Sequence, residues 1–206
     1  MAHPDKLLLA THNQGKVGEF RHLLKDSSFV LVTPSELSIS MVVDESGDTY
    51  EENASIKARA FSAASGLVSL ADDSGLEVDA LDGAPGPWSA RYAGPDASDG
   101  QNLALLLRNM AGVPWERRTA RFVCVVAIAI PSGEVELCRA SCEGIIGLEP
   151  SGASGFGYDP AFYLPQLGKT MAQLDMEGKN RISHRARAVR RAVSIIEKMV
   201  ALNRQL

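Results

Sequence analysis

The chain has 206 residues, of which 45% are apolar and 22% charged, and this suits one soluble globular domain or two tightly joined lobes. Its net charge of −4 excludes a general attraction to nucleic acid or to a membrane surface. No apolar stretch reaches membrane-spanning length, and the polar first residues do not resemble a signal peptide. The three cysteines form no C-x-x-C pair, which favours buried free thiols and a reducing cytoplasm.

The first segment has the layout of a phosphate-binding loop. Residues 6–11 read as a buried strand, and a polar loop with one glycine and one lysine leads from there into an amphipathic helix. Backbone N–H groups at a helix start and a lysine side chain are groups that hold phosphate. The loop lacks the G-x-x-x-x-G-K-[ST] pattern, so an ordinary turn with a solvated Asn13 and Lys16 stays open.

An acidic segment comes next, after a short strand expected at 29–32. Thr49 and Glu52 form a capping-box pattern, which predicts that a helix begins there. Lys57 lies one helical turn from Asn53 on the same face, so both side chains are placed to meet one anion. Most acids of the segment fit a solvated helix start, and one is a candidate metal ligand.

Residues 67–71 predict a further buried strand that ends on Asp72 and Asp73. Two carboxylates at a buried strand end are costly unless a cation meets them, which predicts a metal site. Ser74 and Gly75 are expected to turn the chain back into a half-buried strand at 76–79. Successive side chains of an extended chain point to opposite faces, so the two aspartates are expected to do different jobs.

The middle of the chain predicts a long loop and a hairpin. Residues 82–95 are rich in glycine and proline, and their aromatic residues indicate a shaped wall or an oligomer contact. A helix is expected at 102–110. Strands at 119–130 and 134–143 are separated by a Pro-Ser-Gly turn, which predicts an antiparallel hairpin that forms much of a second lobe's sheet.

The last third contains an aromatic loop and a basic segment. Glycines flank Phe156, which suits stacking of its ring on a nucleobase, although a turn with a core phenylalanine explains the same pattern. Ser183 is a good N-cap for a final helix that reaches about residue 202. His184 and Arg185 stand in the first turn, where cations oppose the helix dipole, so they are candidates for function.

These segments together suit a nucleoside triphosphate. Lysines and N–H groups hold the phosphates, carboxylates hold Mg²⁺, an aromatic ring stacks on the base, and His184 with Arg185 reach base atoms. An arginine or a protonated histidine donates hydrogen bonds and accepts none. Such groups favour a purine with a 6-keto oxygen, which means hypoxanthine, xanthine or guanine rather than adenine.

Six motifs in chain order resemble the inosine/xanthosine triphosphate pyrophosphatase family, the Ham1-like and RdgB-like proteins. They are T-x-N-x-x-K at 11–16, E-N-A-x-x-K-A at 52–58, A-D-D-S-G-L at 71–76, G-A-P-G-x-x-S-A-R-Y at 83–92, G-F-G-Y-D-P at 155–160 and S-H-R at 183–185. The resemblance implies an α/β fold, elongated and two-lobed around a long mixed β-sheet, with the active-site cleft between the lobes. It further implies a single domain over residues 1–206 and a homodimer.

The resemblance also implies an activity, namely Mg²⁺-dependent hydrolysis of ITP, dITP and XTP to the monophosphate and pyrophosphate, which removes deaminated purines from the nucleotide pool. Asp73 resembles the catalytic proton acceptor and a metal ligand, and Glu45 resembles the second metal ligand. His12 stands where many relatives have a smaller residue such as glycine. The residues that resemble substrate contacts are Thr11, His12, Asn13, Gln14, Gly15, Lys16, Lys57, Ser74, Phe156, Gly157, Tyr158, Asp159, Lys179, His184 and Arg185.

Three other functions compete with this one. A Maf-like pyrophosphatase shares the fold and acts on other nucleotides. A nucleotide-binding regulator without turnover is a second alternative, although binding alone rarely needs a paired Glu45 and Asp73. Nucleic-acid binding through the basic C-terminal helix is the third, and the net acidity of the chain argues against it. We expect a cytoplasmic enzyme with no nucleic-acid or membrane partner.

Overall fold

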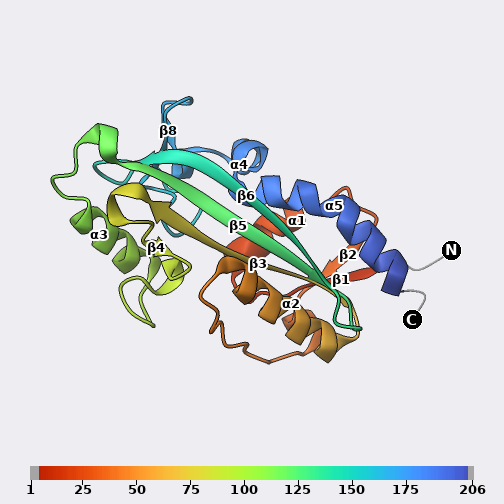
Figure 1. Ribbon diagram of the computed structural model, residues 1–206. Coiled ribbons are helices and arrows are strands. Elements are labelled where there is room, and N and C mark those ends of the chain that lie inside the picture. Colours follow the sequence, from red (N-terminus) through yellow and green to blue (C-terminus); the bar gives the residue numbers. More distant parts are fainter. Residues whose placement is uncertain (1–4, 204–206) are drawn as a thin grey trace. The chain divides into compact units, whose positions relative to one another are not determined.

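The computed structural model of the protein describes residues 5–203 (Figure 1). They form a mixed α/β fold with one eight-stranded sheet in the order β2-β1-β3-β5-β6-β7-β8, and β4 pairs with β3 outside this path. The fold class predicted from the sequence is therefore confirmed. The chain divides into two compact units. Within the described residues, unit 1 comprises 5–73, 124–140 and 185–203, and unit 2 comprises 74–123 and 141–184.

Unit 1 is built on parallel strands and three helices. Its elements are β1 (Lys6–Leu9), α1 (Gln14–Leu23), β2 (Val30–Val32), α2 (Tyr50–Ser65), and the unit 1 parts of β3 (Val68–Val78), β5 (Thr119–Ala129), β6 (Val135–Ile146) and α5 (His184–Asn203). Strand β1 pairs in parallel with both β2 and β3, so that Leu8 lies opposite Val32 and Ser69. Helix α2 covers one face of these strands, and α1 and α5 cover the other (Figure 1).

The core of unit 1 follows the two periodicities of strand and helix. Every second residue of β1, β3 and β5 packs with the apolar stripes of α1 and α5. In the apolar stripe of α5, Ala186, Val189, Ile196 and Val200 are buried, and Val193 is partly buried. On the opposite face, Ala54 and Ala58 of α2 are completely buried, as expected for small residues that let a helix lie close to a sheet.

Strand β3 corrects one prediction. Ser74 and Gly75 do not turn the chain, because β3 runs without interruption through eleven residues from Val68 to Val78. Glycine permits a turn but does not impose one. In unit 2, the two-residue strand β4 (Pro85–Gly86) pairs antiparallel with Leu76 and Glu77 and continues the ladder beyond the glycine. Asp72 and Asp73 therefore lie in the middle of a buried strand, not at its end.

Strands β5 and β6 form the predicted hairpin. They are neighbours in the sheet, and the turn between them is closed by the hydrogen bonds Gly133 N to Ile130 O (2.9 Å) and Ile130 N to Glu134 O (3.1 Å). Neighbouring strands joined by so short a turn are antiparallel. The hairpin is shared between the two units: residues 124–140, which include the turn, are part of unit 1, whereas 119–123 of β5 and 141–146 of β6 contribute to the strands of unit 2.

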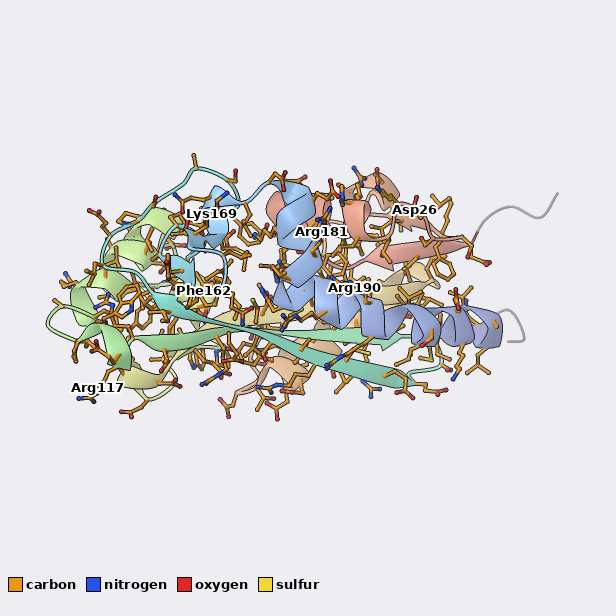
Figure 2. All side chains as sticks on the ribbon, turned by 90° about the horizontal axis from the view of Figure 1, so that it is seen from above. Asp26, Arg117, Phe162, Lys169, Arg181 and Arg190 are labelled. Carbon is orange, nitrogen blue, oxygen red and sulfur yellow. The ribbon has the colours of Figure 1, made fainter. Side chains whose placement is uncertain are left out.

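Unit 2 has its own apolar core. Its further elements are α3 (Asp99–Asn109), β7 (Phe162–Leu164), β8 (Lys169–Thr170) and α4 (Met176–Ile182). The rings of Phe122 and Phe162 pack with centroids 4.3 Å apart, and Phe162 lies inside the unit while Arg117 lies at its surface (Figure 2). The glycine- and proline-rich loop is not structureless, since it contains β4 and a 3-10 turn at Ser89–Arg91.

The start of α2 depends on the predicted capping box, which the structure confirms. Thr49 Oγ1 accepts from Glu52 N at 3.2 Å, and Glu52 Oε2 accepts from Thr49 N at 3.2 Å and Asp48 N at 2.9 Å. We expect Thr49→Ala to lower the free energy of unfolding by about 1 kcal/mol, because it leaves one helix N–H group without its acceptor. Urea unfolding measures this, and Thr49→Ser, which keeps the acceptor, is the control. Equal stability of Thr49→Ala and the parent protein would contradict the expectation.

Candidate active site

The centre of the candidate site in unit 1 is the pair Asp72 and Asp73 in the middle of β3. Adjacent residues of a strand point to opposite faces of the sheet. Accordingly, the Asp72 carboxylate contacts Arg185 of α5, whereas the Asp73 carboxylate accepts from Asn53 Nδ2 of α2 at 3.4 Å. The prediction that the two aspartates differ in their partners is confirmed.

Asp72 is completely buried and paired with two cations. Lys16 Nζ lies 3.0 Å from Oδ1, and Nε and Nη2 of Arg185 each lie 3.2 Å from Oδ2. Burial by itself raises the pKa of Asp72, but Lys16 and Arg185 outweigh burial and hold the pKa well below its ordinary value. Arg185 also binds the buried carboxylate of Glu19 from α1. Asp72 thus joins the first turn of α1 to α5 through ion pairs with Lys16 and Arg185.

Asp73 has the opposite electrostatic balance. Burial raises the pKa of its carboxyl to about 6, and Lys57 and Lys16 offset only part of this effect. The negative charge of Glu45 raises the pKa further. A carboxyl with a pKa near neutrality is suited to accept a proton, and its raised pKa also means that the ionised form lacks a sufficient positive partner.

Lys57 of α2 occupies the position between the two predicted metal ligands. Its buried ammonium donates to Glu45 Oε2 at 2.9 Å and to the carbonyl oxygen of Asp72 at 2.8 Å, and it lies 3.7 Å from Asp73 Oδ1. Burial lowers the pKa of Lys57, but Asp73 and Glu45 outweigh burial and raise it. Lys57 and Asn53 do face one anion, as their spacing predicted, and that anion is Asp73 itself.

The loop before α1 has the geometry expected of an anion site. Asn13 is the N-cap of α1 and accepts from Lys16 N at 3.1 Å, while Thr11 Oγ1 accepts from Asn13 N at 3.2 Å. These bonds fix the loop, and no acidic residue stands in the first turn of the helix. Phosphate contacts by the loop stay a prediction. The exposed side chains of this loop are His12, Asn13 and Gln14, and Thr11, Gly15 and Lys16 are partly buried.

Unit 2 brings together a second group of the predicted residues. Lys179 Nζ donates to Asp159 Oδ2 at 2.5 Å and lies 5.0 Å from the centroid of the Phe156 ring, while Phe156 N donates to Asp159 Oδ2 at 3.1 Å. Gly155, at φ +79°, could not carry a side chain, because a Cβ would stand 2.0 Å from the same Oδ2. Asp159 therefore fixes the aromatic loop and the lysine relative to each other.

The remaining predicted residues of unit 2 have distinct surroundings. Tyr158 is buried and donates to Ser89 O at 2.7 Å, and burial raises the pKa of its hydroxyl. Gly157 N donates to Asp99 Oδ2 at 2.8 Å. His184 is buried and stacks on Phe122 with centroids 4.8 Å apart and an interplanar angle of 18°. Ser74, in β3, is partly buried.

Unit 1 thus joins Lys16, Lys57, Glu45 and Asp73, and unit 2 joins Phe156, Asp159 and Lys179. Arg185 has its guanidinium bound to Asp72 and Glu19, so the contact with a base predicted for it stays a prediction.

Glu19 was not predicted from the sequence as a residue of the site, although its position in the sequence indicates such a role. It stands three residues after Lys16 and directly before the buried Phe20, which places a carboxylate beside the apolar face of α1.

The residues of unit 1 fit a divalent cation. In the described part of the chain, no group of three or more His, Cys, Asp or Glu residues could hold a metal ion. One or two carboxylates, with water and phosphate oxygens, are however the usual ligands of Mg²⁺. The cluster holds four carboxylates and three cationic side chains, so one negative charge is in excess; these residues are Glu19, Glu45, Asp72, Asp73, Lys16, Lys57 and Arg185.

The chain has a mixed α/β fold, and its unit 1 contains a cluster of carboxylates and cationic side chains around Asp72 and Asp73. Residues 7–195 match the model of the Ham1 family, and the chain belongs to that family. It is 50% identical over 194 residues to a dITP/XTP pyrophosphatase of Desulforamulus reducens, a match that covers 94% of this chain and 96% of that protein. A dITP/XTP pyrophosphatase of Geobacillus kaustophilus is 50% identical over 184 residues, with 89% of this chain and 90% of that protein covered.

Two solved structures resemble the chain as a whole. The Ham1 protein of Staphylococcus aureus superposes with a TM-score of 0.83 at 41% identity and covers 94% of this chain and 99% of its own. The HAM1 protein of Coxiella burnetii has a TM-score of 0.84 at 38% identity, with the same coverage of both chains.

The electrostatic difference between the two aspartates predicts opposite effects on stability. Asp72→Asn removes the buried carboxylate that pairs with Lys16 and one of the two that bind the buried Arg185, and it is expected to cost about 3–5 kcal/mol at pH 7.5. The depressed pKa of Asp72 means that its contribution is present above its unfolded-state pKa and declines as pH falls. The raised pKa of Asp73 means that its ionisation costs stability as pH rises through about 6.

Asp73→Asn is therefore expected to be as stable as the parent protein or more stable at pH 7.5, by up to about 2–3 kcal/mol. This advantage disappears below about pH 4, where both states carry a neutral carboxyl. Urea unfolding in EDTA compares the two isosteric substitutions on neighbouring positions. Equal destabilisation by both would contradict the assignment.

Proposed function

We propose that the protein hydrolyses non-standard purine nucleoside triphosphates, namely ITP, dITP and XTP, to the nucleoside monophosphate and pyrophosphate. The observation that carries this proposal is the carboxyl of Asp73 in a buried strand, which shares the Lys57 ammonium with Glu45 and has its pKa raised to about 6. The relatives named dITP/XTP pyrophosphatase at 50% identity support the choice of substrate.

The lysines of the cluster bind and orient the triphosphate. Lys57 now compensates Asp73 and Glu45 and turns from them to phosphate oxygens, while Lys16, whose ammonium has three donors, adds phosphate oxygens to its contact with Asp72. The N–H groups at the start of α1 add neutral donors. Both lysines then stabilise the negative charge that develops on pyrophosphate as the bond from the α-phosphorus breaks.

Asp73 acts as the proton acceptor. It takes a proton from the water that attacks the α-phosphorus, and its pKa near neutrality makes it basic enough to do so while ionised at pH 7. The Asn53 amide, 3.4 Å away, orients the carboxylate from α2.

Glu45 and Asp73 are the residues that would hold Mg²⁺, which we propose as the cofactor. When bound, the metal ion neutralises phosphate charge and makes a coordinated water more acidic. The excess negative charge of the cluster and the raised pKa of Asp73 are the observations that support this part of the proposal.

The base is assigned to unit 2. We propose that Phe156 offers its ring to the purine, and that Lys179 and His184 of the same unit contact the nucleoside. The Arg185 guanidinium binds two carboxylates in unit 1. We propose that Arg185 donates to the base only after these ion pairs rearrange. Donor-only groups at the purine edge favour a 6-keto oxygen.

The proposal also includes the cellular compartment and the oligomeric state of the protein. The three cysteines are buried thiols, which supports the cytoplasm, where thiols stay reduced. Among residues 5–203, no helix is long and apolar enough to span a membrane. The homodimer rests on the family resemblance, and light scattering of the purified protein measures it.

One assay tests the activity. The purified protein is incubated with Mg²⁺ and a panel of nucleoside triphosphates, and pyrophosphate and orthophosphate are measured separately. We expect pyrophosphate as the direct product and faster turnover of ITP, dITP and XTP than of ATP. Orthophosphate as the direct product would contradict attack at the α-phosphorus. A preference for dTTP or UTP would indicate a Maf-like enzyme, and binding without turnover would indicate a regulator.

Asp73→Asn is expected to lower kcat by at least about 100-fold, because the proton acceptor is lost. The control is Asp26→Asn, which removes an exposed carboxylate beyond the end of α1 (Figure 2) and should leave turnover unchanged. The same stopped assay measures both variants at saturating Mg²⁺. Near-normal turnover by Asp73→Asn would refute the assigned role.

A further inference from the structure

His12 makes two contacts that a phosphate loop does not need. Its Nε2 lies 3.2 Å from the carbonyl oxygen of Met41, and its ring meets the Phe61 ring of α2 edge-on, with centroids 6.1 Å apart. A carbonyl oxygen only accepts hydrogen bonds, so Nε2 carries the hydrogen in this contact. The imidazole, although exposed, therefore points toward the chain segment 38–48.

The segment 38–48 contains no helix or strand and carries Glu45. Near its ends it is held by the bonds Ile39 N to Pro34 O (2.8 Å) and Gly47 N to Asn53 Oδ1 (2.8 Å). A segment without regular structure is restrained chiefly by such individual contacts. The bond to Met41 O fixes the chain four residues before Glu45. Four residues of extended chain span at most about 14 Å.

One restraint on Glu45 is Lys57, whose ammonium lies 2.9 Å from its carboxylate. In the proposed function Lys57 turns to the phosphates, and Glu45 turns to the metal ion. At that step this ion pair no longer positions Glu45. Contacts independent of Lys57 then keep the segment in place, and the bond of Gly47 to Asn53 and the bond between His12 and Met41 are both of this kind.

We infer that His12 is a positioning residue: its Nε2–H bond to Met41 O fastens the segment that carries Glu45 to the loop that holds phosphate. This inference rests on the proposed function for its consequence at the metal site, but the bond itself does not. The phosphate loop and the proposed metal ligand thereby move as one body. The contact with Phe61 restricts the ring to the orientation that makes the bond.

Three substitutions of His12 distinguish the effect of its hydrogen bond to Met41 O from the effect of its ring contact with Phe61. His12→Ala removes both contacts, His12→Phe keeps an aromatic ring against Phe61 without a donor, and His12→Gln keeps a donor of similar reach. His22→Gln is the matched control, because His22 lies in the last turn of α1 and takes no part in the site. Unchanged melting temperatures within a few degrees confirm that each variant is folded.

The first readout is amide hydrogen exchange of nucleotide-free, metal-free protein. Peptides within 38–48 are expected to exchange at least about fivefold faster in His12→Ala and His12→Phe, with the parent rate in His12→Gln and His22→Gln. Peptides of α5 serve as an internal control for the fold. Unchanged exchange of 38–48 in His12→Ala would overturn the inference, whatever the activity of the variant.

The second readout is binding of Mn²⁺, followed by electron paramagnetic resonance as a probe of the metal site. We expect His12→Ala to weaken Mn²⁺ binding at least threefold and His12→Gln to restore it, with Glu45→Gln as the positive control. Faster exchange with unchanged Mn²⁺ affinity would show a tether that does not position Glu45, and this would overturn the inference.

The nucleotide dependence of turnover separates positioning from direct contact. A histidine that bound phosphate itself would raise KM for the nucleotide in His12→Ala without a change in exchange of 38–48, which would also contradict the inference. If the parent protein hydrolysed no triphosphate, the proposed function would be refuted, and the exchange and Mn²⁺ measurements would still decide the role of His12.

Discussion

The site depends on the buried ion pairs that Asp72 makes with Lys16 and Arg185. A carboxylate at the centre of a buried strand is tolerated only with such partners, and breaking one side of a buried pair is strongly destabilising. These contacts connect β3 with the loop before α1 and with the first turn of α5. They therefore fix Lys16, and with it the start of α1, relative to the strand that carries Asp73.

Adjacent side chains of a strand point to opposite faces of the sheet, so the neighbouring Asp72 and Asp73 have different charged partners. On the face of α1 and α5, Lys16 and Arg185 both pair with Asp72 and keep it ionised. On the face of α2, Asp73 shares the single ammonium of Lys57 with Glu45, and its pKa rises to about 6. Asp72 thus contributes to stability, and Asp73 has the capacity to accept a proton. A substitution at either position would reveal this difference.

Much of this arrangement was predictable from the sequence, because strand alternation and helix spacing are local rules. They predicted the opposed aspartates, the shared face of Asn53 and Lys57 and the capped start of α2, and the structure confirms each. The uninterrupted course of β3 was not predictable, since pairing with the distant β4 decides whether Ser74 and Gly75 turn. The partners of Arg185 were missed for the same reason, because Glu19 and Asp72 are brought to it only by the tertiary fold.

The most direct test is a pH titration of the metal-free protein labelled with ¹³C at the aspartate carboxyl carbons, with resonances assigned by Asp72→Asn and Asp73→Asn. We expect the Asp73 signal to titrate near pH 6 and the Asp72 signal not to shift between pH 4 and 9. Addition of Mg²⁺ should then move the Asp73 titration to lower pH, because a bound cation stabilises the ionised carboxylate. Titration of both aspartates together near their ordinary pKa of about 3.9 would contradict this expectation.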